Sequence, residues 1–300
     1  MSKTFKQSSQ SFPILIADEW QDYELLDSGE GHKLERFGDF LFMRPDSQAY
    51  WKPANPISEW RSDATFSGRD GEELGRWGFH SSVPQQWPMK WNGLDFYARC
   101  TPFRHLGFFP EQSVHWAWCQ NLIAKSKRQP KILNLFGYTG LASLVCAKAG
   151  AHVTHVDASK KAIAYARENQ EIAGLIDLPI RWIVDDAMKF IEREHRRGNK
   201  YDGIILDPPK HGRGPNGEVF KLEEDLTELV AACANLLSKD ALFMVLTVYA
   251  VRLSFVAIKN IAEDCLSDRE GTIEAGEMAL SQAKSGRLLP TAIYARWKKS

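Results

Sequence analysis

The chain of 300 residues is 44% hydrophobic and 25% charged, which is ordinary for a globular protein and sufficient for one large or two modest domains. Its 38 basic and 38 acidic residues give a formal net charge of zero, which argues against binding of bulk nucleic acid through overall charge. We find no apolar run of about 18 residues and no signal-peptide pattern, so we expect no membrane partner.

The cysteines are an odd number, widely scattered, without a C-x-x-C pair. This pattern is typical of reduced thiols in a cytoplasm rather than of a disulfide framework or a zinc site. The eight histidines show no paired metal spacing either. We therefore expect a cytoplasmic protein that holds no metal. The cysteines are Cys100, Cys119, Cys146, Cys233 and Cys265.

The first hundred residues have the pattern of a β-rich domain. Short alternating or apolar runs at residues 40–43, 49–51 and 96–100 are separated by turn signals such as Asn92-Gly93. This region is rich in tryptophan, which either fills a core short of aliphatic residues or stacks on exposed bases, and we favour the core. We expect a β-rich domain over residues 1–102 that serves substrate recognition. The tryptophans are Trp20, Trp51, Trp60, Trp77, Trp87 and Trp91.

From Lys131 onward, the pattern changes to an alternation of strands and helices. Short strands spaced by helical patterns of about 10–15 residues predict a parallel sheet with helices on both faces. We expect a Rossmann-like, seven-stranded α/β sheet within a domain over residues 103–300. The predicted strands are 131–135, 152–156, 180–184, 201–206, 241–247, 271–277 and 291–297, and helices are predicted at 141–149, 160–173 and 222–237, with a further charged helix ending near 194.

The turn after the first of these strands is the candidate ligand site, because an open α/β sheet binds ligands beyond the carboxyl ends of its strands. It reads Asn134-Leu135-Phe136-Gly137-Tyr138-Thr139-Gly140, and its glycines let the backbone come close to a ligand. Asp157 ends the second strand, 20 residues after Gly137, a separation at which a carboxylate can accept both hydroxyls of a ribose. The alternative for Asp157 is a helix N-terminal charge, although Ser159 is equally placed to cap that helix.

The third and fourth strands also end in acids. Asp185-Asp186-Ala187 follows the third strand, where a carboxylate can accept a hydrogen bond from an adenine amine or simply cap the next helix. Asp207-Pro208-Pro209-Lys210 follows the fourth, and its prolines stiffen a loop that can orient a nucleophile over the cleft. A rigid structural turn is the alternative there.

The runs LNLFGYTG, HVDAS, VDDA and ILDPPK, in this order and spacing, resemble the class I S-adenosylmethionine-dependent methyltransferases. They are most similar to the branch that contains bacterial large-subunit ribosomal RNA methyltransferases. Residues 105–112 are similar to the hairpin-and-Gln motif that precedes the first strand in that branch. The resemblance covers about residues 103–297, and it implies S-adenosylmethionine as the cofactor and a base of RNA as the acceptor.

Carried over by position, the resemblance places the turn after the first strand around the methionine moiety of the cofactor. It places Asp157 at the ribose and Asp186 at the adenine edge. The expected catalytic residues at the reacting face are Asp207, Pro208, Pro209 and Lys210. The expected cofactor-binding residues are Phe109, Gln112, Asn134, Phe136, Gly137, Tyr138, Thr139, Gly140, Asp157, Ala158, Ser159, Asp185, Asp186, Ala187 and Asp207.

One departure from the branch narrows the chemistry. Members that methylate carbon 5 of cytosine use a cysteine nucleophile after the fourth or fifth strand. The loops at residues 207–212 and 247–252 contain no cysteine in this chain. The sequence therefore favours a nitrogen acceptor over cytosine carbon 5.

The sequence leaves two alternative roles for several residues beside the reacting face. His211 is either a general base or a bystander, and the glycine-rich residues 212–217 form either a lid or an ordinary surface loop. Arg252 either binds a phosphate or pairs with a local acid.

Three other functions compete with RNA methylation. Local basic runs at residues 124–131 and 193–200 support an RNA substrate, whereas zero net charge fits a methyltransferase acting on a small molecule or a protein side chain. A nicotinamide-dependent dehydrogenase would want G-x-G-x-x-G, and this turn has no third glycine in register. A non-catalytic α/β binding scaffold is the last alternative.

Overall fold

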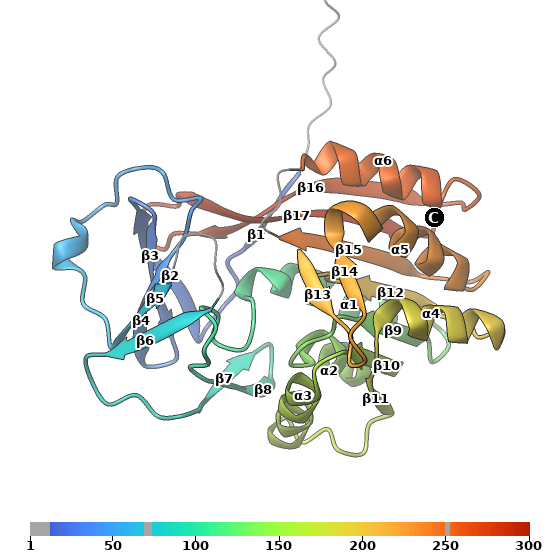
Figure 1. The fold of residues 1–300 in the computed structure, drawn as a ribbon, viewed down its shortest axis with the longest axis horizontal. Helices are drawn as coiled ribbons and strands as arrows, with labels where there is room; N and C mark the ends of the chain where they lie inside the picture. Colours follow the sequence, from blue (N-terminus) through green and yellow to red (C-terminus); the bar gives the residue numbers. More distant parts are fainter. Residues whose placement is uncertain (1–12, 69–73, 250–252) are drawn as a thin grey trace, which may run out of the picture.

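The computed structural model describes residues 13–68, 74–249 and 253–300, in which a β-rich part lies beside a larger sheet flanked by helices (Figure 1). The β-rich part contains a five-stranded sheet in the order β2-β3-β4-β5-β6 and a two-stranded ribbon, β7-β8. Its elements are β2 (Tyr23–Gly29), β3 (His32–Phe37), β4 (Phe40–Pro45), the 3-10 turn η1 (Ile57–Glu59), β5 (Ala64–Gly68), β6 (Gly75–Phe79), β7 (Trp87–Trp91) and β8 (Leu94–Ala98).

The larger sheet has eight strands in the order β1-β16-β17-β15-β12-β9-β10-β11, and only β17 runs antiparallel to its neighbours. All seven strands expected from the sequence are present, so the predicted Rossmann-like α/β sheet is confirmed, and β1 adds an eighth strand that the sequence did not predict. Strands such as β9 and β12 are buried along nearly their whole length, as expected for parallel strands covered on both faces. The strands are β1 (Ile14–Ala17), β9 (Lys131–Leu135), β10 (His152–Asp157), β11 (Ile180–Val184), β12 (Gly203–Leu206), β15 (Phe243–Tyr249), β16 (Thr272–Ser281) and β17 (Leu288–Lys298).

Helices cover both faces of this sheet. Alternate strand residues explain the two layers, since Leu133 packs with α4, α5 and α6 while Ile132 packs with α1 and α2. Within the described ranges, no helix is long and apolar enough to span a bilayer. The helices are η2 (Pro110–Gln112), α1 (Ser113–Ala124), α2 (Leu141–Lys148), α3 (Lys160–Ile172), α4 (Ala187–Arg196), α5 (Leu222–Leu236) and α6 (Phe255–Cys265), and a short hairpin is formed by β13 (His211–Arg213) and β14 (Val219–Lys221).

The two parts are joined by more than the chain between them. Strand β1 pairs in parallel with β16 and so covers backbone groups that would otherwise form an open sheet edge. In Figure 1, β16 and β17 extend from the large sheet into the β-rich part. There Leu280 and Leu289 are buried in the same hydrophobic cluster as Phe42 and Phe96, and Gln282 donates a hydrogen bond of 3.1 Å to Asp27. The two parts therefore share one core.

The tryptophans of the β-rich part belong to this core. Trp60, Trp87 and Trp91 are at most 9% exposed, and Trp20 and Trp51 pack against the buried cluster. Indole N–H groups find acceptors inside the part, as in the 3.1 Å bond from Trp87 to the carbonyl of Phe37. The interpretation of these residues as core is confirmed.

One predicted strand is wrong. Residues 49–51 form no strand, because their carbonyls accept hydrogen bonds from the turn between β2 and β3. The N–H of Glu30 donates to Trp51, and that of Gly31 to Ala49. A segment that pairs with a tight turn has no adjacent extended strand with which to form further backbone hydrogen bonds. The alternation of side chains in the sequence does not show which partner a segment will have.

The shared core predicts a large effect of truncating Phe96, which is fully buried and contacts the rings of Trp20 and Phe108. We expect Phe96→Ala to lower the free energy of unfolding by about 3–5 kcal/mol, because it removes a ring and leaves a cavity. Urea unfolding followed by circular dichroism measures this. Tyr50→Ala, at a side chain that is 88% exposed, is the control and should stay within about 0.5 kcal/mol of the unsubstituted protein. Equal effects of the two substitutions would contradict the shared core.

Candidate functional site

The carboxyl ends of three neighbouring strands define the site. Strand β9 pairs with β10 on one side and with β12 on the other, so the chain reverses its direction of progress across the sheet at β9. Such a switch point is where open α/β sheets bind ligands. Residues 136–140 and 207–210 directly follow β9 and β12, and residues 157–159 begin at the last residue of β10. The structure therefore brings the three predicted segments together.

The turn after β9 holds an unusual backbone conformation. Phe136 and Tyr138 have φ angles of 55° and 50°, in the left-handed region that residues with side chains rarely adopt. A Cβ on Gly137 would lie 2.4 Å from Cε1 of His155, so the turn rests directly on that ring. Strain of this kind persists only where the surroundings impose it, and it concentrates at functional sites.

Asn134 and Thr139, two of the expected cofactor-binding residues, stabilise the turn through buried hydrogen bonds. The Asn134 amide donates a 2.9 Å hydrogen bond to Ser143, whose hydroxyl is 2.9 Å from Nδ1 of His155. The Thr139 hydroxyl donates to the carbonyl of Gly107 at 2.6 Å. Burial lowers the pKa of His155 to about 3, so its ring is neutral at physiological pH. The side chains of Asn134 and Thr139 are thus buried structural supports of the turn.

Asp157 connects the tip of β10 to the turn. Its carboxylate accepts hydrogen bonds from the backbone N–H of Tyr138 at 2.9 Å and of Ser159 at 2.8 Å. Burial raises the pKa of Asp157, an effect opposed by these two N–H donors. Helix α3 is capped by Ser159, whose hydroxyl accepts from the N–H of Ala162, so the cap does not need Asp157. Ala158 lies between them, half-buried.

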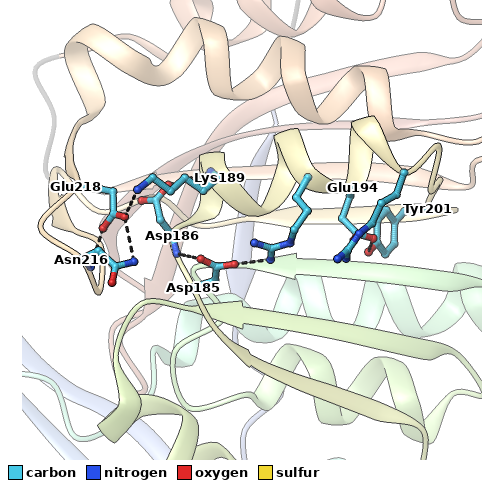
Figure 2. Close-up of polar contacts among 9 residues, drawn as sticks. Asp185, Asp186, Lys189, Glu194, Tyr201, Asn216 and Glu218 are labelled. Carbon is cyan, nitrogen blue, oxygen red and sulfur yellow. Dashed lines mark hydrogen bonds and ion pairs between the residues drawn. The ribbon is translucent and has the colours of Figure 1, made fainter.

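The acids after β11 already have protein partners (Figure 2). Asp186 caps α4, because one of its carboxylate oxygens accepts a 3.0 Å hydrogen bond from the N–H of Lys189. Asp185 forms an ion pair with Arg193 of the same helix and accepts from the N–H of Asp186. Ala187 is the first, buried residue of α4. The N–H of Asp185 donates to the carbonyl of Asp157 at 3.2 Å, which keeps the two strand tips adjacent.

The tip of β12 is tied to the segment that precedes the sheet. Gln112, at the end of η2, donates from Nε2 to a carboxylate oxygen of Asp207 at 3.1 Å and to the hydroxyl of Tyr249 at 3.1 Å. Burial and the nearby carboxylates of Glu111 and Asp207 raise the pKa of Tyr249 well above its ordinary value, so the phenol stays protonated. Phe109 packs its ring 5.2 Å from that of Tyr249. Sequence reasoning missed Tyr249, for which an aromatic residue at the end of β15 was the available signal.

The loop after Asp207 leads from the buried tip of β12 to the protein surface. Pro208 is buried, while Pro209 and Lys210 are exposed. The residues that follow form the hairpin of β13 and β14, with His211 exposed at its start. Arg252 lies outside the described residues.

The tip of this hairpin is held to α4. Glu218 forms an ion pair with Lys189 at 2.5 Å and accepts a hydrogen bond from the N–H of Asn216 at 2.9 Å (Figure 2). Phe220 packs its ring 5.5 Å from Phe136 in the turn after β9. The hairpin is therefore an ordered element that contacts the turn after β9 on one side and α4 on the other.

With the site geometry established, comparison with known proteins identifies the family. A solved structure of the S-adenosylmethionine-dependent methyltransferase from Agrobacterium tumefaciens is 46% identical, covers 100% of this chain and 98% of that one, and superposes with a TM-score of 0.93. The chain belongs to the S-adenosylmethionine-dependent methyltransferases. This confirms the predicted cofactor and excludes the dehydrogenase alternative.

Other relatives of this methyltransferase lie in the predicted branch. Ribosomal RNA large subunit methyltransferase I of Aeromonas salmonicida is 25% identical over 95% of this chain and 70% of that protein. The protein of the same name from Alteromonas mediterranea is 30% identical over 61% of this chain, a match that spans 43% of that protein's length. The family described as conserved hypothetical protein 95 matches residues 115–249.

The turn predicts a strong effect of adding one methyl group to Gly137. We expect Gly137→Ala to weaken binding of S-adenosylhomocysteine at least about tenfold, because the new Cβ would displace the turn from the His155 ring. Titration calorimetry measures this affinity. Gly78→Ala is the matched control, since its Cβ would meet only a carbonyl oxygen at 3.8 Å. Equal affinities of the two variants would argue against the turn as part of the cofactor site.

Proposed function

We propose that this methyltransferase transfers a methyl group from S-adenosylmethionine to a nitrogen of a ribosomal RNA base. The observation that carries the proposal is the carboxylate of Asp207, held by Gln112 at the tip of β12 beside the turn after β9. The names of the curated relatives support ribosomal RNA as the substrate. The absence of a cysteine after β12 and β15 supports a nitrogen acceptor.

The cofactor-binding assignment follows the three strand tips. We assign residues 136–140 to the methionine moiety, Asp157 to the ribose and Asp186 to the adenine edge. Two features support this fit: the backbone at Gly137 has no room for a Cβ, and the half-buried Asp157 stands at the tip of β10 beside that turn. When bound, S-adenosylmethionine supplies a methyl group already activated by its sulfonium.

The protein then has to position the acceptor rather than activate the methyl group. We infer that Asp207 accepts a hydrogen bond from an N–H of the base and directs the lone pair of that nitrogen toward the methyl carbon. Pro208 and Pro209 fix the loop, with Lys210 at its exposed end. When the acceptor nitrogen is methylated, the Asp207 carboxylate would take the proton that this nitrogen loses.

The properties of the existing cysteines agree with this chemistry. Cys119, Cys146 and Cys233 are buried within the core. Burial raises the pKa of Cys100 to about 12, which leaves it a protonated thiol. A covalent route to cytosine carbon 5 would require a reactive thiolate at the reacting face.

We further propose a recognition domain over residues 1–102 and a catalytic domain over residues 103–300, with β1 of the first part completing the sheet of the second. Its location would be the cytoplasm, which is supported by five cysteines that are all free. Among the residues that the structure covers, no cluster of His, Cys, Asp and Glu side chains is suited to a metal ion.

The proposed function predicts where a labelled methyl group goes. We expect transfer from labelled S-adenosylmethionine into the ribosomal RNA fraction of a strain that lacks the gene, in preference to protein and metabolites. Nucleoside analysis should then find an N-methylated base. Label confined to metabolites or protein would instead support the small-molecule or side-chain methyltransferase that zero net charge allows.

For Asp207, we expect Asp207→Ala to lower kcat at least about a hundredfold while S-adenosylhomocysteine binds within about tenfold of the unsubstituted protein. Asp207→Asn is the matched variant, because it keeps the shape of the side chain and cannot take a proton at neutral pH. Single-turnover rates and calorimetry separate the two effects. A turnover rate of Asp207→Ala equal to that of the unsubstituted protein would remove the role assigned to this carboxylate.

The raised pKa of Asp157 predicts a pH dependence of cofactor binding. Only the ionised carboxylate accepts hydrogen bonds from both ribose hydroxyls, so affinity is full above its pKa and falls as pH drops through it. Because burial raises this pKa, the loss should begin at a higher pH than for a solvated aspartate. Calorimetry with S-adenosylhomocysteine between about pH 8 and about pH 4.5 tests this. The control is Asp157→Asn, whose affinity for S-adenosylhomocysteine should be low and nearly independent of pH. The same pH profile in both proteins would rule out Asp157 as the titrating group.

A further inference from the structure

A row of aromatic rings leads from the reacting face to the protein surface. Tyr249, which shares Gln112 with Asp207, lies 5.2 Å from the ring of Phe109. Phe109 lies 5.1 Å from the ring of His105, and His105 in turn lies 5.3 Å from Phe103. The last two rings are nearly parallel, at 10°, and Phe103 is 40% exposed. The row thus ends in an aromatic ring that is supported on one face and open to solvent.

His105 gives this outer ring a rigid support. It is 8% exposed, and its Nδ1 lies 3.2 Å from the hydroxyl of Tyr138 in the turn after β9. Burial together with the positive charges of Arg44 and Arg104 lowers its pKa to about 3. The imidazole is therefore a neutral, fixed plane at physiological pH, and Phe103 stacks on it.

The backbone around Phe103 is also anchored, at the junction of the two parts of the molecule. Leu74, directly before β6, forms an antiparallel bridge to Phe103, and the N–H of Gly75 donates to the carbonyl of Pro102 at 2.9 Å. The N–H of Phe103 donates to the hydroxyl of Thr101. An exposed aromatic ring on anchored backbone loses little conformational freedom when a flat ligand stacks on it.

We propose that Phe103 is a stacking platform for a base that flanks the acceptor nucleotide in a single-stranded segment of RNA. Three ring-to-ring steps separate Phe103 from Tyr249, so Phe103 is too distant to hold the acceptor base itself. Stacking on aromatic side chains is the usual way in which proteins hold unpaired bases. The inference rests on the proposed RNA substrate and names the feature of that substrate that is recognised.

The test compares Phe103→Ala with Phe103→Trp, and with Phe79→Ala as a matched control. Phe79 is also an exposed aromatic residue, at 54%, but it lies at the far end of β6 from Leu74. Two readouts are used: KM for an unmodified transcript of large-subunit ribosomal RNA, and Kd for a fluorescein-labelled oligouridylate of about 12 nucleotides, since stacking tolerates any base.

We expect Phe103→Ala to raise both KM and Kd at least about fivefold, as for the loss of one stacked base. Its kcat at saturating RNA and its affinity for S-adenosylhomocysteine should stay within about twofold of the values for the unsubstituted protein, because His105, Phe109 and Tyr249 are unchanged. Phe103→Trp should bind both RNAs at least as tightly as the unsubstituted protein. Phe79→Ala should have the same KM and Kd as the unsubstituted protein.

The experiment distinguishes failure of the proposed platform from failure of the proposed function. If Phe103→Ala methylates RNA with an unchanged KM and binds oligouridylate normally, or if Phe79→Ala shows the same loss, the platform is rejected while the proposed function stands. If the unsubstituted protein methylates no RNA transcript and labels only protein or metabolites, the proposed function fails, and the platform fails with it.

Discussion

The strained turn on the His155 ring is the constraint on which the site depends. Gly137 lies against that imidazole, and on either side of it Phe136 and Tyr138 adopt left-handed conformations. This directs the N–H of Tyr138 toward Asp157 and so fixes the distance between the first two strand tips. The buried hydrogen bonds of Asn134 and Ser143 beneath the ring prevent relaxation, because breaking them would leave buried polar groups unpaired.

The β-rich part contributes to the site through the segment that connects it to the sheet. Gln112 reaches from η2 to both Asp207 and Tyr249, so the reacting tip is positioned by residues that precede the sheet. The same segment carries Phe109 and His105, and the core behind it is shared by both parts. Under the proposed function, recognition and chemistry would be coupled through this one short stretch of chain.

Several cations of the basic runs in the sequence are already paired within the protein. On α4, Lys189 is paired with Glu218 (Figure 2) and Arg193 with Asp185. Arg128 near α1 is paired with Asp202. Cations already engaged within the protein are less available to phosphates, which agrees with a net charge of zero. Under the proposed function, aromatic stacking at the site would supply contacts that overall charge does not.

The sequence by itself determined the α/β sheet, the order of its strands along the chain, and the glycine turn with the acids after β10, β11 and β12. These features are local: the period of apolar residues sets each element, and a motif at a strand end needs no distant partner to be recognised. Only the tertiary structure decided that β1 joins the large sheet, that Tyr249 meets Asp207 through Gln112, and that Asp186 caps α4. Such contacts join residues far apart in the chain, or choose between two hydrogen-bond partners for one side chain, and neither is fixed by spacing alone.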